Sequence, residues 1–382
     1  LSFDMLGEGA RTDPDAARYF AAYVAAIEAV GKTTNPSLPL YRRAGISVKL
    51  SALNPRYSWA QQDRCIPDMV EKLASLCRKA AEANITLTVD AEEADRLELS
   101  LEIIAQVAAK RDFLTWAGLG LAIQAYDKRC HRLVDHVADI AKQTGRVLQV
   151  RLVKGAYWDT EIKRAQIAGL PDYPVFTRKF HTDVSYAACA QKLLSYRPHL
   201  YPMFATHNAQ TVATVLELSG GDRSGFEFQR LFGMGEALGD TILSENLAPV
   251  TIYAPVGSHE DLLPYLVRRM LENGANTSFL NKIRSKDVPP DVLTADPIVR
   301  AITLRDTLSS SLPLPADIYG TVRHNSAGFD LSASETREFL LQQRDDATKW
   351  RTQAITPLIG GQWPIKSGGM QKQVSPIDTA ET

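Results

Sequence analysis

The sequence has few cysteines, no long apolar run and almost no net charge, and each shortage excludes a class of protein. Its four cysteines lie far apart, without a Cys-x-x-Cys pair or a Cys/His cluster, so neither a zinc site nor a disulfide framework is indicated. The apolar runs are strand-sized, which argues against a membrane-spanning helix, and no signal peptide is visible. A formal net charge of -1 gives no long-range attraction to nucleic acid or to an anionic membrane. We expect a cytoplasmic protein with reduced thiols.

The segment Val147–Trp158 is the most informative part of what is present. It reads as an apolar strand, yet it carries Arg151 and Lys154 and stops at Gly155. A charge within an apolar strand is costly unless a partner or ligand compensates it, and glycine lets a ligand approach the backbone closely. The segment therefore predicts a strand that ends in a binding site. Two cations that merely reach the rim and pair with carboxylates are the alternative.

Strand-like segments alternate with helical patterns over roughly 280 residues, which is the count and size of a (βα)8 TIM-like barrel. The predicted strands are Leu1–Gly7, Gly45–Leu53, Ile85–Glu92, Gly118–Tyr126, Val147–Ala156, Met203–Ala209, Phe226–Met234 and Thr251–Val256. A doubly wound open sheet is the alternative. It is less favoured because no Gly-x-Gly-x-x-Gly opens the first helix and because every strand ends in polar residues.

Cap signals place three of the helices. Asp13-Pro14 predicts a helix start with Asp13 as the N-cap, and Gly31 predicts its end. Pro67-Asp68 predicts the start of the second helix, and Ser258 that of the last one. The connection from Tyr157 to Asp183 is long for a compact domain, which is typical of a functional or mobile loop.

Each predicted strand contributes a polar side chain near its carboxyl end. Those ends form the active-site face of a barrel, and sheet faces under helices are apolar, so we expect these side chains in the mouth. They are Asp4, Lys49, Asp90, Gln124, Arg151, Thr206 with His207, Gln229 and Tyr253. A ring of buried ion pairs that only holds the barrel together is the alternative, although such pairs add little net stability.

The last helix of the barrel, Leu262 to Ala275, carries Arg268, Arg269 and Glu272 among apolar residues. Two arginines suit a small carboxylate, which they bind through forked hydrogen bonds. For both to serve one ligand, the helix must lie across the barrel mouth. A surface helix in which Glu272 pairs with either arginine is the alternative.

Nine segments occur in an order that resembles the proline dehydrogenase domain of bacterial bifunctional proline utilization A proteins. They are FDMLGEGA, SVKLSALNPRY, VDAEE, AIQAY, VRLVKGAYWDTEIKRAQ, FATHN, FEFQRLFGMGE, IYAPVGSHE and YLVRRMLENGANTSF. The resemblance covers about residues 1–285. It implies a distorted (βα)8 barrel that holds non-covalent FAD and oxidises L-proline to Δ1-pyrroline-5-carboxylate by hydride transfer to flavin N5.

The resemblance also implies roles for individual residues. Asp90 and Arg151 match catalytic positions, and Arg151 lies near flavin N5 in the family. The substrate-binding positions are Lys49, Tyr253, Arg268 and Arg269, with Glu272 and Asp4 in support. The flavin-binding positions are Ala91, Gln124, Arg151, Val153, Lys154, Gly155, Ala156, Trp158, Lys179, Thr206, His207 and Gln229. Tyr253 favours proline over hydroxyproline. Membrane quinone is the implied electron acceptor, with peripheral contact at the inner membrane when the protein is reduced.

Residues 286–382 resemble an interdomain linker and the first elements of an aldehyde dehydrogenase module. This part contains proline-rich connectors, a short helical stretch, a charged helix over Leu331–Trp350 and a strand and turn over Leu358–Trp363. The nucleotide-binding body and catalytic cysteine of that module are absent from the sequence, so we predict no glutamate-semialdehyde dehydrogenase activity. The family's N-terminal helical arm and DNA-binding segment are absent too, which leaves the oligomeric state undecided.

Two other functions fit the residues. A Schiff-base lyase or aldolase would use Lys49 or Lys154, because such lysines occur at the strand ends of barrels. The second alternative is a folded fragment that binds flavin without turnover.

Overall fold

Eight parallel strands close into a barrel in the order β1 to β8, with β8 paired to β1, as the sequence predicts. The computed structural model describes residues 1–274, 295–304 and 312–347, together with residues 289, 360, 361, 374 and 376. The strands are β1 Ser2–Met5, β2 Gly45–Val48, β3 Thr86–Val89, β4 Leu119–Gln124, β5 Leu148–Val153, β6 Leu200–Ala205, β7 Glu227–Leu231 and β8 Val250–Val256. The chain is therefore a (βα)8 barrel.

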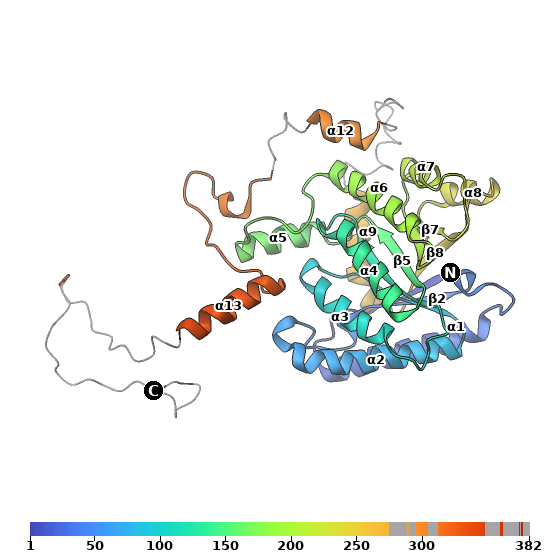
Figure 1. The fold of residues 1–382 in the computed structure, drawn as a ribbon, viewed down its shortest axis with the longest axis horizontal. Helices are drawn as coiled ribbons and strands as arrows, with labels where there is room; N and C mark the ends of the chain where they lie inside the picture. Colours follow the sequence, from blue (N-terminus) through green and yellow to red (C-terminus); the bar gives the residue numbers. More distant parts are fainter. Residues whose placement is uncertain are drawn as a thin grey trace. The chain divides into compact units, whose positions relative to one another are not determined.

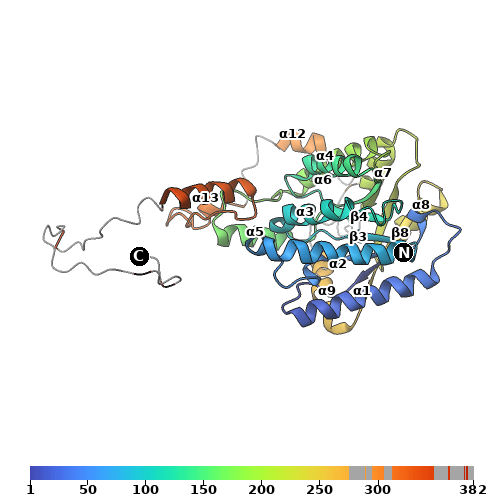
Figure 2. The same ribbon diagram turned by 60° about the horizontal axis from the view of Figure 1, so that its bottom comes forward.

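Helices surround the strands on the outside (Figures 1 and 2). Those of the barrel are α1 Asp13–Thr33, α2 Gln62–Glu82, α3 Leu97–Ala108, α4 Cys130–Thr144, α5 Trp158–Ala168, α6 Lys179–Ser195, α7 Ala209–Leu218, α8 Glu236–Ser244 and α9 Leu262–Gly274. Two later helices are α12 Pro297–Leu304 and α13 Ser334–Ala347. The 3-10 helices are η1 Leu40–Arg42, η2 Leu50–Ala52, η3 Trp59–Gln61, η4 Ala94–Arg96, η5 His259–Asp261 and η6 Pro315–Asp317. Within the described part of the chain, no helix is both long and apolar enough to cross a membrane.

The two faces of the strands differ in polarity. Residues of one parity, such as Val48, Leu87 and Val150, are buried beneath the helices in the main hydrophobic core. Residues of the other parity point into the barrel, and on most strands they include buried polar side chains, namely Ser2, Asp4, Ser47, Lys49, Thr88, Gln124, Gln149, Arg151, Glu227 and Gln229. Barrel interiors are usually filled by branched apolar side chains. The polar interior of this barrel therefore indicates a binding or catalytic site.

One predicted N-cap is off by one residue, and one predicted helix start is wrong. The N-cap of α1 is Thr12, whose hydroxyl accepts a hydrogen bond from the Asp15 amide while the Asp15 carboxylate accepts one from the Thr12 amide, so Asp13 is already helical. The helix α1 also continues past Gly31 to Thr33. Helix α2 begins at Gln62, and Pro67 lies inside it. The apolar face around Cys65 and Met69 is fully buried there, which offsets the backbone hydrogen bond that proline cannot donate.

The predicted strand boundaries are less accurate than the strand count. Strand β6 runs from Leu200 to Ala205 rather than from Met203 to Ala209, and it includes Pro202 although proline cannot donate a ladder hydrogen bond. After Val48 the chain turns into η2, so the predicted second strand is too long.

The long connection after β5 contains a helix of its own. Helix α5 packs Ile162 and Ala165 against Tyr126, Tyr173 and Val175, which form a hydrophobic cluster separate from the main core. Residues 312–329 lie along this helix, and the hydroxyl of Tyr173 donates to the carbonyl of Pro313 at 2.7 Å. The connection predicted as a loop is therefore an ordered, well-packed part of the barrel rim.

The chain divides into two compact units, Leu1–Phe329 and Asp330–Thr382. In the second unit, helix α13 falls within the charged helix predicted for Leu331–Trp350. The predicted strand at 358–363 lies largely outside the described residues. The predicted domain division at residue 285 stays a prediction.

Candidate functional site

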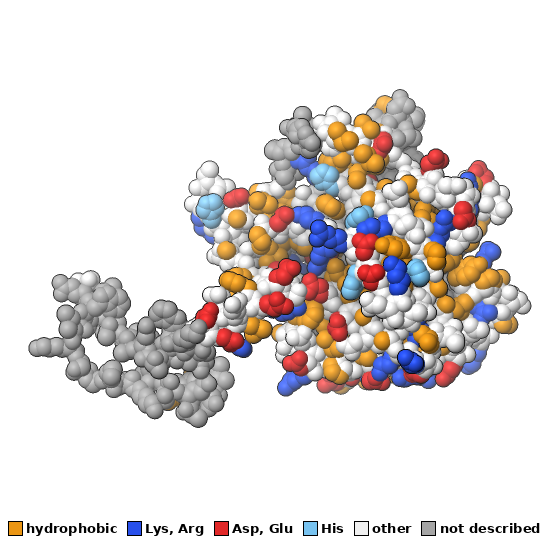
Figure 3. All heavy atoms as spheres, viewed as in Figure 1, with side chains coloured by type: hydrophobic (Ala, Val, Ile, Leu, Met, Phe, Trp, Pro, Cys, Tyr) orange, Lys and Arg blue, Asp and Glu red, His pale blue; other side chains and the backbone are white. Residues whose placement is uncertain are grey.

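A cavity of about 1050 Å³ opens at the carboxyl ends of the strands. Every strand-end residue expected in the mouth lines it, namely Asp4, Lys49, Asp90, Gln124, Arg151, Thr206, His207, Gln229 and Tyr253. Other residues of the cavity wall come from the α5 region and from α9. The face of the molecule drawn in Figure 3 mixes acidic and basic side chains without a field of one sign. The cavity, which gathers all the expected strand-end residues, is therefore the candidate site.

Arg151 lies at the centre of the cavity floor, and protein groups engage all three of its guanidinium nitrogens. Nη1 donates to Asp90 at 2.6 Å and Nε donates to the side-chain oxygen of Gln229 at 2.7 Å. Nη2 lies 3.2 Å from the hydroxyls of both Ser2 and Ser47. These contacts fix the orientation of the guanidinium before any ligand binds, which is the preorganisation that electrostatic catalysis requires.

Lys49 joins the two carboxylates of the floor. Its ammonium pairs with Asp4 and lies 3.2 Å from Asp90, which also accepts a hydrogen bond from the hydroxyl of Tyr253 at 2.8 Å. Burial raises the pKa of Asp4. Burial acts the same way on Asp90, but Lys49 and Arg151 outweigh it and lower the pKa of that carboxyl. Asp90 is thus held as the anion. We call Asp4, Lys49, Asp90, Arg151 and Gln229 the inner network.

The protonation of Lys49 bears on the lyase alternative. Burial alone would lower its pKa, but Tyr253, Asp4 and Asp90 together raise that pKa well above the usual value. A Schiff base requires the neutral amine, so Lys49 is a poor nucleophile here. Burial lowers the pKa of Lys154, although its partner Asp183 opposes the shift. Lys154 is therefore the better nucleophile of the two.

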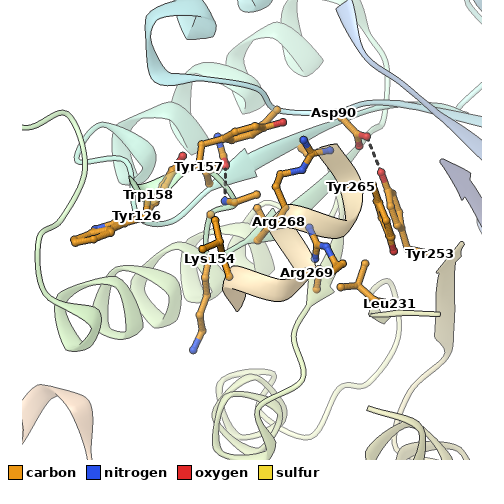
Figure 4. Close-up of a pocket in the computed structure, with 18 of the residues that line it drawn as sticks. Asp90, Tyr126, Lys154, Tyr157, Trp158, Leu231, Tyr253, Tyr265, Arg268 and Arg269 are labelled. Atoms are coloured by element: carbon orange, nitrogen blue, oxygen red, sulfur yellow. Dashed lines mark hydrogen bonds between the residues drawn. The ribbon is translucent and has the colours of Figure 1, made fainter. Parts of the chain in front are cut away.

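Helix α9 covers the mouth, and we call it the cover helix. Arg268 and Arg269 project from it into the cavity that Asp90 and Tyr253 line (Figure 4). Both terminal nitrogens of Arg268 donate to the carboxylate of Glu8, at 2.5 and 2.9 Å. Burial opposes the charge of Arg268, but the hydrogen bond to Glu8 raises its pKa. A forked arginine already holding a carboxylate shows that this position can bind the carboxylate of a ligand.

Aromatic rings frame both arginines. The Arg268 guanidinium carbon lies 5.4 Å from the ring centre of Tyr157, and that of Arg269 lies 5.3 Å from the ring centre of Tyr265. These contacts orient the two cations as cation–π pairs do. The side chain of Glu272 lies outside the described residues, so its predicted contact with either arginine stays a prediction.

The end of β5 provides a cradle of backbone and cations. The amide of Ala156 donates to the side-chain oxygen of Gln124 at 3.2 Å, and Lys154 and Lys179 share the carboxylate of Asp183. Gly155 has φ +144°, and a Cβ there would lie 2.4 Å from the ring of Tyr126. Only glycine fits this position. The cradle can therefore hold an anionic group close to the backbone.

The remaining expected flavin positions also reach the cavity wall. Ala91, Val153, Trp158, Thr206 and His207 all line it. The Nε2 atom of His207 accepts from the Leu231 amide at 3.0 Å, which leaves its Nδ1 protonated in the neutral ring. Together with the glycine cradle and the two lysines, this donor set and the cavity volume fit a large dinucleotide with a pyrophosphate. Among the described residues, no cluster of candidate ligands could hold a metal ion.

Sequence reasoning missed four groups that the structure brings to the site. Glu8 pairs with Arg268, Asp183 pairs with Lys154, and Tyr157 and Tyr265 lie against the arginines. Glu8 could have been noticed because it follows the first strand closely, as the other site residues follow theirs. Its partner lies 260 residues away in sequence, however, and no local pattern identifies such a pair.

Comparison with known proteins gives a consistent result. Residues 1–282 match the family model "Proline dehydrogenase". The "Bifunctional protein PutA" of Klebsiella aerogenes is 46% identical over 390 residues, which cover 99% of this chain and 29% of that protein. A crystal structure of a Proline Utilization A (PutA) mutant from Bradyrhizobium japonicum is 51% identical, covers 90% of this chain and 35% of its own, and has a TM-score of 0.87.

A more distant structure shows the same fold. PutA from Bdellovibrio bacteriovorus, inactivated by N-propargylglycine, is 26% identical, with a TM-score of 0.87 over 100% of this chain and 40% of its own. The chain thus spans less than a third of the length of the first curated relatives it matches. The similarity covers the barrel and the residues that line its mouth.

Proposed function

The chain belongs to the proline dehydrogenase family, and on that premise we propose that it oxidises L-proline to Δ1-pyrroline-5-carboxylate with FAD as its cofactor. One observation carries the proposal. Two arginines on the cover helix project over a floor where Lys49, Asp90 and Arg151 are held in fixed positions. In this arrangement the two arginines bind the carboxylate of a small amino acid, and the substrate ring lies against the charged floor, whose side chains are already in position.

In this proposal the substrate carboxylate takes the place of Glu8 at Arg268. Glu8 shows the forked geometry, and Arg269 and Lys49 add two further cations to the same cavity. Tyr253, whose hydroxyl is held by Asp90, presents its ring as an apolar wall for the pyrrolidine ring. This clamp fixes the substrate carbon that bears the departing hydride.

FAD, when bound, supplies the electron acceptor that takes a hydride at its N5 atom. The residues proposed to hold it are Ala91, Gln124, Val153, Lys154, Gly155, Ala156, Trp158, Lys179, Thr206, His207 and Gln229. Arg151 presents its fixed positive charge to the region where negative charge accumulates, and Asp90 keeps that guanidinium in place. The cover helix excludes water from the reacting atoms.

The visible spectrum of the purified chain tests the proposal. Flavin bands that bleach on anaerobic addition of proline would support both cofactor and reaction, and an Arg268→Met variant should require more proline for the same bleaching. A protein that stays colourless after incubation with FAD would contradict the proposal. Borohydride then tests the lyase alternative, because only a Schiff base at Lys154 or Lys49 would be trapped as a stable adduct.

Membrane quinone is the proposed final electron acceptor, and the proposed location is the cytoplasm, with contact at the inner membrane on electron transfer. A soluble quinone analogue added to the proline-bleached protein should restore the flavin bands. Bands that return only with oxygen would contradict the quinone assignment.

A further inference from the structure

A buried glutamate lies beneath the inner network and has no place in the proposed reaction. Glu227 is on β7 with the same parity as Gln229 and is 2% exposed. Its Oε1 atom accepts a hydrogen bond from Nε2 of Gln229 at 2.6 Å, and the Oε1 atom of Gln229 accepts from Nε of Arg151 at 2.7 Å. A continuous path of short hydrogen bonds therefore runs from Glu227 to the guanidinium.

This path is directional. A glutamine side chain has a donor end and an acceptor end, and a carboxyl group keeps an acceptor oxygen whether or not it is ionised. Glu227 therefore holds the NH₂ end of Gln229, and the carbonyl end must face Arg151. With the amide reversed, its NH₂ group would face a guanidinium that has no acceptor to offer. The orientation of Gln229, and with it one of the contacts of Arg151, depends on Glu227.

The protonation of Glu227 also sets the net charge around Arg151. Asp4 and Asp90 balance Lys49 and Arg151 in the inner network, so an ionised Glu227 adds an anion that nothing in the network offsets. A neutral Glu227 leaves the charges balanced. In a buried site of low dielectric, this difference is felt strongly at Arg151.

We propose that Glu227 is a positioning residue for the reaction, which acts through Gln229 to orient Arg151 and to set the net positive charge that Arg151 presents to the flavin. The inference rests on the proposed function, since it assigns Arg151 to the flavin. Glu227 itself touches neither substrate nor cofactor.

The groups around Glu227 place its proton exchange in the neutral range. Burial raises its pKa to about 7, while the side chains of Gln229 and Thr251, the Leu1 amino group and Arg151 oppose the shift. Tyr201 also faces Glu227, which raises the pKa of that phenol further beyond the effect of burial. Glu227 is thus neutral below about pH 7 and anionic above it, so the charge presented by Arg151 should fall as the pH rises.

The test compares Glu227→Gln with the wild-type chain. The glutamine keeps an acceptor for Gln229 but carries no charge at any pH. Rates of flavin reduction by proline should agree within a factor of about two near pH 6, and the wild type should be roughly threefold to tenfold slower than the variant near pH 8.5. The flavin midpoint potential should diverge over the same range, with the wild type lower. A purely structural role would shift both quantities equally at all pH values.

A second measurement does not depend on flavin or proline. Infrared titration of the flavin-free chain from about pH 6 to about pH 8.5 should show loss of the protonated carboxyl band of Glu227. That part of the signal should be absent from Glu227→Gln. If the band titrates as expected but the wild-type flavin is never reduced by proline, the proposed function fails while the titration of Glu227 stands.

Glu161 provides the matched control. It is another buried glutamate, burial raises its pKa to about 7, and its carboxylate accepts from the Ala94 amide at 2.7 Å rather than from the path to Arg151. Glu161→Gln should remove a separate part of the infrared signal, and its rate of flavin reduction and midpoint potential should fall with rising pH as those of the wild type do. A Glu161→Gln variant whose rate and potential follow those of Glu227→Gln instead would overturn the inference.

Thr251→Val covers the case in which Glu227→Gln fails to fold. Thr251 favours the ionised form of Glu227, so its loss should move the pH at which rate and potential change to a higher value. Parallel pH profiles for wild type and either variant would contradict the role of Glu227.

Discussion

The inner network and the cover helix hold charges over the same cavity in opposite ways. In the inner network, the side chains of Lys49 and Arg151 are each 5% exposed, and each has at least two charged or polar partners from other strands. On the cover helix, Arg268 and its partner Glu8 are 12% and 24% exposed and form a single forked pair. The difference teaches that the side chains of the inner network are in position before a ligand binds, whereas the contact between Arg268 and Glu8 at the cover helix is one that a ligand carboxylate can replace.

Removing the centre of the floor should have the largest effect. Arg151→Met leaves Asp90 with one cationic partner fewer in a buried site. We expect the free energy of unfolding to fall by about 3–5 kcal/mol and flavin reduction by proline to slow by about 10²- to 10³-fold. Urea unfolding and anaerobic stopped-flow spectroscopy measure the two effects.

The matched control for Arg151 is Arg78→Met. Arg78 pairs with Asp112 and Glu71 on the outside of the barrel and is 37% exposed. We expect a change in the free energy of unfolding below about 1 kcal/mol. Equal losses in the two variants would remove the contrast between floor and surface.

Removing the forked arginine of the cover should affect binding more than stability. For Arg268→Met we expect the KM for proline to rise about 10- to 100-fold, with a smaller change in kcat, because a carboxylate contact is lost. The free energy of unfolding should change by less than about 1 kcal/mol. Glu8→Gln, which removes the competing carboxylate, should leave KM unchanged or lower it. A stability loss as large as that of Arg151→Met would show that the cover is as fixed as the floor.

Tyr253 lies where the two regions meet, and Tyr253→Phe should have an intermediate effect. The variant keeps the ring and removes the hydroxyl that donates to Asp90 at 2.8 Å. We expect kcat/KM to fall about 10- to 100-fold, since a hydrogen bond to a charged group contributes about 1.5–3 kcal/mol. Tyr19→Phe is the control, because its hydroxyl contacts Asp261 at 3.4 Å away from the floor. Equal activities of the two variants would contradict a functional role for the hydrogen bond from Tyr253 to Asp90.

Acid unfolding gives the smallest predicted effect. Lys49 and Arg151 hold the folded pKa of Asp90 below its usual 3.8. Its contribution to stability is therefore complete above that value and is lost as the pH falls through the folded pKa. In Lys49→Met this loss should begin at higher pH. The free energy of unfolding near about pH 4 should therefore be lower than that of the wild type by an additional amount on the order of 1 kcal/mol. Thermal unfolding as a function of pH measures it, and superimposable curves would contradict the pairing.

The sequence was sufficient for the barrel and for the floor because both follow from local rules. Strand alternation and polar strand ends put Lys49, Asp90 and Arg151 in one mouth without any knowledge of their contacts. The same rule of parity could have found Glu227, which lies two positions before Gln229 on β7. Glu227 lies before the carboxyl end of its strand, so the rule that predicts site residues at strand ends does not include it.

The cover was predicted only in outline, because its contacts join distant parts of the chain. A helix with two arginines across the mouth was expected, but Glu272 was the only partner that helical spacing could suggest. The partner that the structure shows is Glu8, which no periodicity connects to Arg268. The predicted start of α2 failed for a different reason: burial of an apolar face can outweigh the local preference of a residue such as Pro67.

The contact of Gly155 with Tyr126 has a consequence at the level of the gene. A single-base change in a glycine codon that replaces the residue always introduces a side chain, and even a methyl group at position 155 would meet the tyrosine ring. No single-base change that replaces Gly155 is therefore expected to be mild. In a saturation-mutagenesis screen for growth on proline, position 155 should behave almost as a stop codon does, while Gly239, with its nearest neighbour the flexible end of Arg230, should accept alanine.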